Sequence, residues 1–422
     1  MGESDKLSLE FTEKNLNEIY DFSSGLSKSA DEFGFGFPFL SFKTIFNNYY
    51  IDSDLDELVN STTKEQKKHS IKKGDVFLTR TSETLDELGM SCVALKDYPN
   101  ATYNGFTKRL RPKEDNVIHP LYAAYYFRSS IFRKYVDSMA VMTTRASLNN
   151  DILSHLPIFY PSYENQEKIG KLLHDLSKKI ELNNQINHNL EGQILNIFNE
   201  WFVKFSLFDE FEDSELGFIP KGWCVDYFGS KKSCKIIGSG IDDFIGSKIY
   251  IATADVDNSS ITNNNTLITM EDKPSRANMQ PIEKSIWFAK MIESRKLIMV
   301  DDYCEDLINN YIFSTGFCGL ECSKEYFYYL WTFLLTDGFD TMKNNFCTGT
   351  TMQSINNKDT KMIKFVLPDK ETISNFNKIA KPIYEKIYYN NREINELSSL
   401  RDTLLPKLMS GEIDISEINC DL

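Results

Sequence analysis

The sequence predicts an α+β protein built from two similar modules, each a mixed α/β domain followed by one long helix with a coiled-coil seam. Two observations lead to this prediction: an internal repeat at a spacing of 207 residues, and apolar residues that recur every 3.5 residues on average at the end of each repeat. The chain has 422 residues. At roughly 100–200 residues per domain, it has room for both modules.

The repeat is clearest in the second half of each module. Residues 143–150 read TTRASLNN and residues 350–357 read TTMQSINN, and 13 of the 60 positions from 143 to 202 are identical to the residues 207 positions later. A unit of about half the chain is too long for a solenoid repeat. We therefore interpret the repeat as the duplication of a whole module, which gives the chain a pseudo-two-fold organisation.

Each module ends in a segment with the spacing of a coiled-coil helix, at residues 162–205 and 369–410. The a and d positions step by four and three residues without a slip in both copies. Six seam positions match between the copies, and these are assigned to helix pairing: Ile180, Asn183, Leu190, Ile387, Asn390 and Leu397. Asparagine at a seam position weakens packing but fixes register and partner, so the seam predicts one defined alignment.

The ends and the interior of these helices carry further signals. Ser162 and Asp369 each follow a proline and are suited to cap the first turn. Pro382 lies inside the second helix and removes one backbone hydrogen bond. We therefore expect a kink or a break near Lys381.

The stretches before the helices, residues 1–161 and 206–368, have the pattern of mixed α/β domains, and residues 411–422 form a C-terminal tail. Alternating or continuous apolar runs predict strands in both domains, and an aromatic-rich run predicts one helix in each. The strands are expected at 74–80, 91–95, 248–255, 284–289 and 296–301, and the helices at 121–136 and 326–335.

The composition excludes several classes of protein. No run approaches the ~18 apolar residues of a membrane span, and the acidic N-terminus has no secretory signal, which predicts a cytoplasmic protein without a membrane partner. The eight cysteines form no C-x-x-C pair, and no metal site is predicted. Phosphate-loop, dinucleotide, hydrolase, zinc-protease and deaminase motifs are missing, as is the target-base motif of amino-methyltransferases. The sequence therefore predicts a non-catalytic protein.

Three strings carry a family resemblance. Residues 199–205 (NEWFVKF) with 214–223 (SELGFIPKGW) resemble the central junction of the specificity (S) subunits of type I restriction-modification systems. Residues 400–413 (LRDTLLPKLMSGEI) are similar to that family's C-terminal signature. The turn at 349–356 and the strand at 74–80 also resemble family patterns, so the resemblance extends over nearly the whole chain.

The resemblance implies a non-catalytic reader of double-stranded DNA with two target-recognition domains, each reading one half of a bipartite sequence. It further implies that the two helices pack antiparallel, set the distance between the half-sites and dock two methyltransferase subunits that use S-adenosylmethionine. Two restriction subunits, which use ATP and Mg, are further partners that the resemblance leaves open. This chain itself needs no cofactor.

DNA contact calls for basic side chains near phosphates and for Arg, Asn, Gln or Thr near base edges. Candidates in the first module are Lys64, Lys67, Lys68, Arg80, Lys108, Arg109, Thr143, Thr144 and Arg145. Candidates in the second module are Lys231, Lys232, Arg276, Arg295, Lys296, Thr350, Thr351 and Gln353.

Two other readings stay open at the level of sequence. The net charge of −14 and the heptads also fit a coiled-coil interaction or scaffold protein without DNA binding. A nuclease or methyltransferase with an unrecognised site is the third reading, which activity of the purified chain alone would establish.

Overall fold

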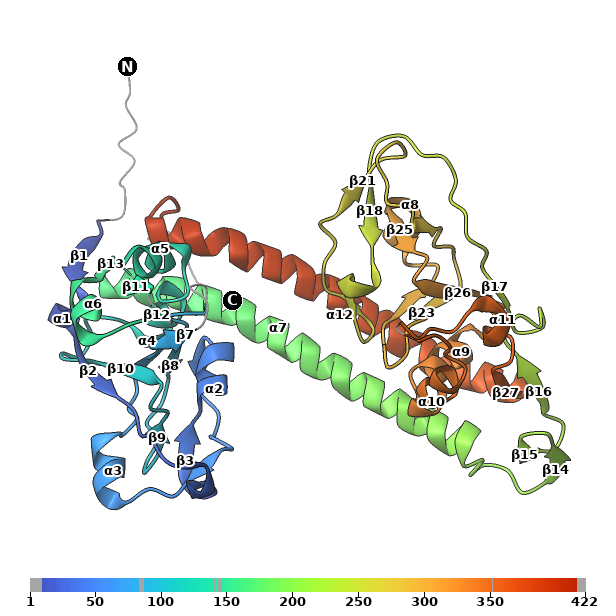
Figure 1. The fold of residues 1–422 in the computed structure, drawn as a ribbon, viewed down its shortest axis with the longest axis horizontal. Coiled ribbons are helices and arrows are strands. Elements are labelled where there is room, and N and C mark those ends of the chain that lie inside the picture. The colour runs from blue at the N-terminus through green and yellow to red at the C-terminus, as the bar shows by residue number, and fades with distance from the viewer. Residues whose placement is uncertain (1–9, 83–86, 140, 143–145, 351, 416–422) are drawn as a thin grey trace. The chain divides into compact units, whose positions relative to one another are not determined.

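The computed structural model describes residues 10–82, 87–139, 141–142, 146–350 and 352–415, and the chain divides into two compact units (Figure 1). Unit 1 comprises Met1–Glu181 and Ile394–Leu422, and unit 2 comprises Leu182–Glu393. Two long helices, α7 (Tyr163–Phe198) and α12 (Lys370–Ser410), each contribute residues to both units. The α+β fold class is confirmed, whereas the domain boundaries stay a prediction.

Unit 1 is organised around a five-stranded sheet with the order β2–β10–β6–β8–β4. Its neighbouring strands are antiparallel except β4 and β8, which run parallel. β6 and β8 confirm the two strands expected from the sequence of this module. The strands are β2 (Tyr20–Ser24), β4 (Tyr50–Ile51), β6 (Val76–Thr79), β8 (Ser91–Ala94) and β10 (Thr107–Pro112).

The single aromatic helix expected at 121–136 is wrong, because the structure has two helices there. Arg128 lies in the break, where its guanidinium donates to the backbone oxygens of Phe46 at 2.8 Å and Ser91 at 2.6 Å. Ser129 Oγ then accepts from the backbone N–H of Phe132 at 3.4 Å and starts the next helix. The helices are α4 (Pro120–Tyr126), which packs on β8, and α5 (Ser130–Met139).

Smaller elements surround this sheet. Two- and three-stranded sheets are formed by β1 (Thr12–Asn15) with β13 (Pro157–Tyr160), by β3 (Phe33–Leu40) with β5 (Leu58–Val59) and β9 (Thr102–Tyr103), and by β7 (Thr81–Ser82) with β11 (Val141–Met142) and β12 (Ala146–Ser147). The short helices are α1 (Leu16–Ile19), η1 (Ala30–Glu32), α2 (Phe42–Asn47), α3 (Thr63–Lys68) and α6 (Asn150–His155).

Unit 2 contains two four-stranded sheets, with the orders β17–β26–β23–β24 and β21–β18–β25–β22. The strands expected at 248–255, 284–289 and 296–301 are confirmed as β18, β23 and β24, although β18 ends at Ile251 and a 3-10 turn follows. The strands are β17 (Cys234–Ile236), β18 (Lys248–Ile251), β21 (Leu267–Ile268), β22 (Ala277–Met279), β23 (Ser285–Ala289), β24 (Leu297–Val300), β25 (Tyr311–Ser314) and β26 (Phe317–Cys322).

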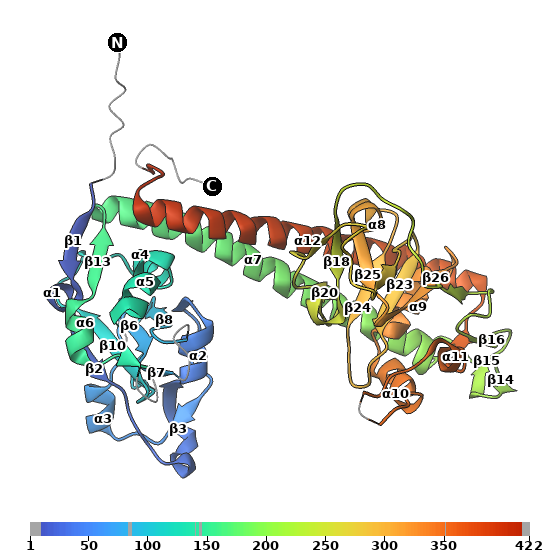
Figure 2. The ribbon, with the colours of Figure 1, turned by 45° about the horizontal axis from the view of Figure 1, so that its top comes forward.

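The remaining elements of unit 2 flank these sheets. The aromatic helix expected at 326–335 is confirmed as α9 (Phe327–Leu334), which packs on β23 (Figure 2). Other helical elements are η3 (Thr253–Asp255), α8 (Glu305–Asn310), α10 (Asp337–Asn345), α11 (Asn357–Thr360) and the π turn η2 (Asn199–Val203) that follows α7. Two-stranded pairs are formed by β14 (Phe211–Ser214) with β15 (Gly217–Pro220), β16 (Cys224–Tyr227) with β27 (Lys364–Leu367), and β19 (Val256–Asp257) with β20 (Ser260–Ile261).

The two modules share one structural plan, as the repeat predicts. α4, α5, α6 and β13 begin 207 residues before α9, α10, α11 and β27, respectively. The sheet order β2–β10–β6–β8 also matches β17–β26–β23–β24. Equivalent side chains make equivalent bonds, since Tyr122 and Tyr329 each donate to a backbone oxygen, that of Phe159 and that of Val366.

The predicted seam residues of the long helices are shielded from solvent, and their role in helix pairing stays a prediction outside the asparagine contacts of unit 2. All twenty a and d residues of the two runs are buried or half-buried, including the half-buried Ile180, Leu190 and Leu397 and the buried Ile387. Within unit 2, Asn183 Nδ2 donates to Glu393 Oε2 at 2.8 Å. Within each unit, α7 and α12 lie side by side (Figures 1 and 2).

Two asparagine contacts fix the alignment of the helices in unit 2. Asn187 Nδ2 donates to Asn391 Oδ1 at 2.8 Å, and Asn390 Nδ2 donates to Asn187 Oδ1 at 2.8 Å. Because Asn183 meets Glu393 while Asn187 meets Asn390, the two helices run antiparallel in this unit. The amides therefore hold the register, as expected of polar seam residues.

The helix ends agree with the predicted caps, but the proline effect does not. Ser162 Oγ accepts from the N–H of Asn165 at 3.4 Å, and Asp369 Oδ1 accepts from the N–H of Glu371 at 2.9 Å. The break expected near Lys381 is wrong, because α12 continues without interruption through Pro382. Pro382 and Lys378 are exposed, so the carbonyl that loses its N–H donor lies on the solvent-facing side of the helix.

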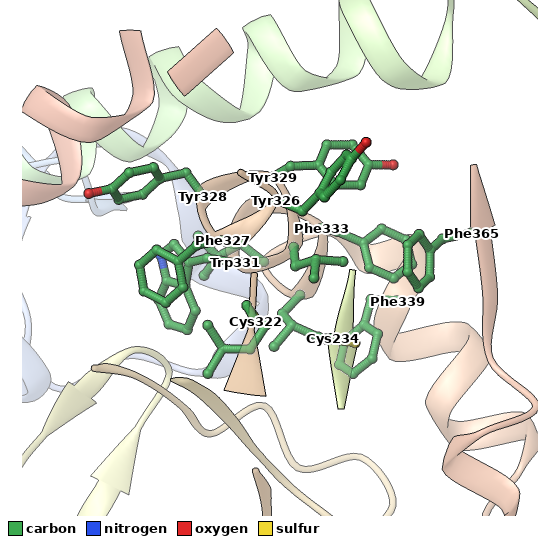
Figure 3. Close-up of a cluster of buried hydrophobic side chains, with 14 of the residues drawn as sticks. Cys234, Cys322, Tyr326, Phe327, Tyr328, Tyr329, Trp331, Phe333, Phe339 and Phe365 are labelled. Atoms are coloured by element: carbon green, nitrogen blue, oxygen red, sulfur yellow. The ribbon is translucent and has the colours of Figure 1, made fainter. Parts of the chain in front are cut away.

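A large aromatic cluster forms the core of unit 2 around α9. Figure 3 shows Phe327, Trp331 and Phe333 above Cys234 and Cys322 of the sheet. Burial raises the pKa of the Cys234 thiol to about 11. The thiols therefore act as small apolar side chains at ordinary pH, with little nucleophilic character.

Candidate nucleic-acid interface

In unit 1, Arg80 is the residue that follows the buried strand β6. Its backbone N–H donates to Phe106 O at 3.0 Å, and its carbonyl accepts from the N–H of Leu148 at 2.8 Å. The hairpin loop around Phe106 and the chain just after residues 143–145 thus hold Arg80 between them. Phe106 is 60% exposed, so this end of the sheet is open to solvent.

Unit 2 contains the same arrangement around Lys290, which follows β23. The backbone N–H of Lys290 donates to Gly316 O at 2.9 Å, and its carbonyl accepts from the N–H of Ile355 at 2.9 Å. Ile355 is the repeat counterpart of Leu148. Each module therefore places a basic residue at the end of the central strand, between a hairpin loop and the segment that follows the Thr-Thr pair.

Lys290 is not among the candidates predicted from the sequence. The endings LTR of residues 78–80 and FAK of residues 288–290, a basic residue after a buried strand, carried the signal. The connection between sheet and aromatic helix differs in length, with residues 113–119 in unit 1 and residues 323–326 in unit 2. Because of this three-residue difference, equivalent residues are 207 positions apart from the aromatic helix onward but 210 positions apart in the sheet before it. An alignment of the two repeats without gaps therefore does not place Lys290 opposite Arg80.

Two other basic candidates of unit 1 are already engaged inside the protein. Lys108 Nζ donates to Asn150 Oδ1 at 2.7 Å, and Arg109 donates through a terminal nitrogen to Ser70 O at 2.6 Å. Both residues are 8% exposed, and burial together with the nearby charge of Arg80 lowers the pKa of Lys108. This geometry favours a structural role for both, and their contact with DNA stays a prediction.

The remaining candidates of unit 1 gather on α3. Lys64, Lys67 and Lys68 are exposed. The helix begins with a capping box, in which Glu65 accepts from the N–H of Thr62 at 2.8 Å and the N–H of Glu65 donates to Thr62 Oγ1 at 3.3 Å. Hydrogen bonds from Thr62 lower the pKa of Glu65 to about 2. A short, well-capped helix thus presents three lysines to solvent.

The candidates of unit 2 also include some side chains that are bonded inside the protein and others that are exposed to solvent. Arg295 pairs with Asp337 at 2.7 Å, and Lys296 Nζ donates to Val256 O at 2.7 Å, so both already have internal partners. Lys232 Nζ lies 2.9 Å from Cys224 Sγ. The exposed residues are Lys231, Lys232, Arg276, Thr350 and Gln353.

The Thr-Thr segments are described only in part, because Thr143, Thr144, Arg145 and Thr351 lie outside the described residues. In unit 2 the flanks of the segment form a closed hairpin, in which Thr348 and Ser354 exchange two backbone hydrogen bonds of 3.1 Å. The N–H of Ile292 donates to Gln353 O at 3.0 Å. This hairpin therefore lies directly beside Lys290.

Comparison with known proteins decides the family. The profile of the type I restriction modification DNA specificity domain matches residues 9–192. The specificity subunit of the type I restriction enzyme MjaIX from Methanocaldococcus jannaschii is 28% identical over 96% of this chain and 93% of its own length. The specificity subunit of the type I restriction enzyme HindI from Haemophilus influenzae is 22% identical over 89% of this chain and 94% of its own length. The chain belongs to the family of type I restriction-modification specificity subunits.

A solved structure supports the same fold for this specificity-family chain. The crystal structure of a type I restriction-modification S subunit from M. genitalium has a TM-score of 0.55 and covers 97% of this chain and 98% of that chain, at 14% identity. Its likeness shows the fold alone. The family profile ends within α7, so the equivalence of the two modules in this chain comes from the structure itself.

Members of the specificity-subunit family are non-catalytic. Among the described residues, no group of three or more His, Cys, Asp or Glu side chains is placed to hold a metal ion. None of the helices within the described ranges is long and apolar enough to cross a membrane.

Proposed function

We propose that this specificity subunit reads a bipartite target in double-stranded DNA, with one half-site contacted by each module. The observation that carries the proposal is the duplicated strand end, where Arg80 and Lys290 are held by matching backbone hydrogen bonds beside an open loop. Duplicated frames with different surface residues are suited to two half-sites of different sequence. The alternative function, that of a coiled-coil protein without DNA binding, leaves this duplication unexplained.

The charge distribution is compatible with DNA despite the net charge of −14. Affinity depends on local cations near phosphates rather than on the average over the chain. The exposed lysines of α3 in unit 1 and the exposed Lys231 and Arg276 in unit 2 supply such cations. Acidic residues elsewhere remain available for protein partners.

The long helices are proposed as the spacer between half-sites and as the docking surface for two methyltransferase subunits. Their support is that both helices contribute residues to both units, that their seam residues are buried or half-buried, and that Asn183 and Asn187 of α7 contact α12 in unit 2. We further propose that S-adenosylmethionine belongs to the methyltransferase subunits, that ATP and Mg belong to two restriction subunits where these join, and that the complex works in the cytoplasm.

Exchange of one module tests the two-module reading. Residues 1–155 end with α6, before the long helix, and are replaced by the matching module of a relative. We expect sequencing of methylated sites to show one new half-site and one unchanged half-site. A change of both half-sites together, or of neither, would contradict the proposal.

Lengthening the helices tests the spacer. Because α7 and α12 run antiparallel in unit 2, with Asn183 at the level of Glu393, four residues are inserted after Asn184 and four after Arg392. Each helix grows by about 6 Å, close to two base pairs at 3.4 Å rise. We expect a longer gap between unchanged half-sites, and an active complex with the original gap would show that the helices do not measure DNA.

A further inference from the structure

The strand-end residues of the two modules share a position and a charge but not a shape. We propose that Arg80 and Lys290 each bind one DNA phosphate and anchor the backbone of their half-sites, while the residues around them read bases. This inference rests on the proposed function and assigns phosphate binding and base recognition within each half-site to different residues.

The chemistry common to the two residues favours phosphate contact over base contact. Both Arg and Lys can contact guanine, but Arg does so through a planar fork and Lys as a compact point charge, so the two side chains do not replace each other at a bidentate site. A phosphate accepts either one. Equivalent positions that hold Arg in one module and Lys in the other therefore point to a task that needs only positive charge.

The backbone fixes both residues more firmly than an ordinary surface cation. Each is held on one side by a hairpin loop and on the other by the segment after the Thr-Thr pair. In unit 2 the buried Lys343 adds support, since its Nζ donates to Met291 O at 3.3 Å and Ser294 O at 2.7 Å. A fixed cation loses less conformational entropy on binding than a mobile one.

Both side chains have bonding capacity left. Lys290 is half-buried, and its Nζ donates to Thr315 O at 3.2 Å, which uses one of three donors. Arg80 is half-buried too, and its Nε is buried without a hydrogen-bond partner. An anion at this strand end would accept from the remaining donors of Lys290 Nζ and from the exposed part of the Arg80 guanidinium.

The residues next to the anchors differ between modules, as base readers for different sequences should. The loop residue that accepts from Arg80 is the exposed Phe106, whereas the one that accepts from Lys290 is Gly316. Beside Lys290, Met352 is 77% exposed and Gln353 is exposed as well. Constant anchors with variable neighbours would keep DNA in one position while the recognised sequence changes.

Lys290→Gln tests the inference in the complete complex with its methyltransferase subunits. We measure binding to a DNA duplex containing the methylated site over a range of salt, and we sequence the methylated sites. One lost phosphate contact is expected to weaken binding about tenfold and to reduce the slope of log K against log salt by about 0.9, with both half-sites unchanged. Lys290→Arg is expected to keep wild-type affinity and slope.

The control is Lys324→Gln, which removes an exposed lysine beyond the opposite end of β26 and should leave binding unchanged. Altered bases in one half-site of the Lys290→Gln complex would identify a base reader and overturn the inference. So would unchanged affinity and slope while the wild-type complex binds well. Failure of the wild-type complex to bind any DNA would instead overturn the proposed function.

Discussion

The two modules keep the same internal frame and differ at their surfaces. Asn149 and Asn356, 207 residues apart, cap α6 and α11 by accepting backbone N–H bonds at 2.8 Å. By contrast, unit 1 carries the lysine-rich α3, whereas the chain between β17 and β23 in unit 2 forms short strands and one 3-10 turn. Duplication has thus preserved the bonds that position the strand end carrying Arg80 or Lys290, and divergence has concentrated in the loops around it.

Breaking one buried ion pair should unfold one module and leave the other intact. Asp301 is fully buried, where it pairs with Lys284 and accepts from Tyr328 OH at 2.6 Å. Asp301→Ala removes the buried carboxylate, leaves the buried Tyr328 hydroxyl without its acceptor and leaves Lys284 with only Asp302 at 3.5 Å, so it should destabilise unit 2 by about 3 kcal/mol. Hydrogen exchange followed by peptide should show lost protection in β23 and β24 with β6 unaffected.

The matched variant in unit 1 is Asp75→Ala. Asp75 accepts two bonds from Arg111, at 2.7 and 2.6 Å, and is also fully buried. Asp75→Ala should produce the opposite pattern of hydrogen exchange, with loss of protection in β6 and β10 and none in β23 and β24. Equal loss in both units from either variant would show that the modules do not fold as separate cooperative units.

A second set of variants tests a contact whose two partners are exchanged between the modules. Tyr125 OH of α4 donates to Ser177 Oγ of α7 at 2.9 Å. In unit 2 the tyrosine lies on the long helix instead, and Tyr384 OH of α12 is 2.7 Å from Thr332 Oγ1 of α9. Tyr125→Thr should cost about 3 kcal/mol through the cavity it leaves, and Ser177→Tyr about 1–3 kcal/mol through overpacking.

The double variant Tyr125→Thr with Ser177→Tyr recreates the unit 2 arrangement inside unit 1. It should be more stable than the sum of the single effects predicts, by about 0.5–3 kcal/mol. Urea unfolding of the three variants under identical conditions gives this coupling energy. Strict additivity would mean that the two contacts are not structural equivalents.

A smaller effect is expected from the tyrosine hydroxyls that bond to the sheet. Tyr122→Phe removes the donor that reaches Phe159 O at 2.7 Å, and Tyr329→Phe removes its equivalent at Val366. Each should cost about 1–2 kcal/mol, because a buried carbonyl loses its side-chain donor. Peptide-resolved hydrogen exchange should place the losses at β13 and β27 respectively, and a large difference between them would weaken the equivalence.

The smallest effect is a pH dependence confined to unit 1. The pKa of Glu65 is lowered to about 2 by its bonds with Thr62 and Lys28, below the usual value of about 4.3. The stabilisation of α3 is therefore complete above pH 4.3 and is lost as the pH falls through about 2. An NMR titration of the Glu65 carboxyl carbon should show this midpoint, and Glu65→Gln should abolish the pH dependence of α3 protection.

Much of the fold could be predicted because the repeat and the heptad spacing are properties of sequence alone. The break between α4 and α5 at Arg128 could not be predicted, because it depends on hydrogen bonds to backbone oxygens of α2 and β8, which are distant in sequence. The continuity of α12 through Pro382 depends on exposure of one helix face. For the candidate site, the sequence named Arg80 at the end of a strand, and its contact with DNA stays a prediction. The internal partners of Lys108, Arg109 and Arg295 could not be predicted, because burial and ion pairing require the folded chain.

The asparagine contacts of the long helices also bear on how new specificities can arise by recombination between related genes. Asn187 must meet Asn390 and Asn391, so α7 and α12 have to be inherited as a compatible pair. A crossover before residue 163 leaves that pair within one parent, whereas a crossover between the helices combines seams of two parents. The polar seam should therefore favour exchange of recognition modules upstream of a helix, and it should select against hybrid spacers.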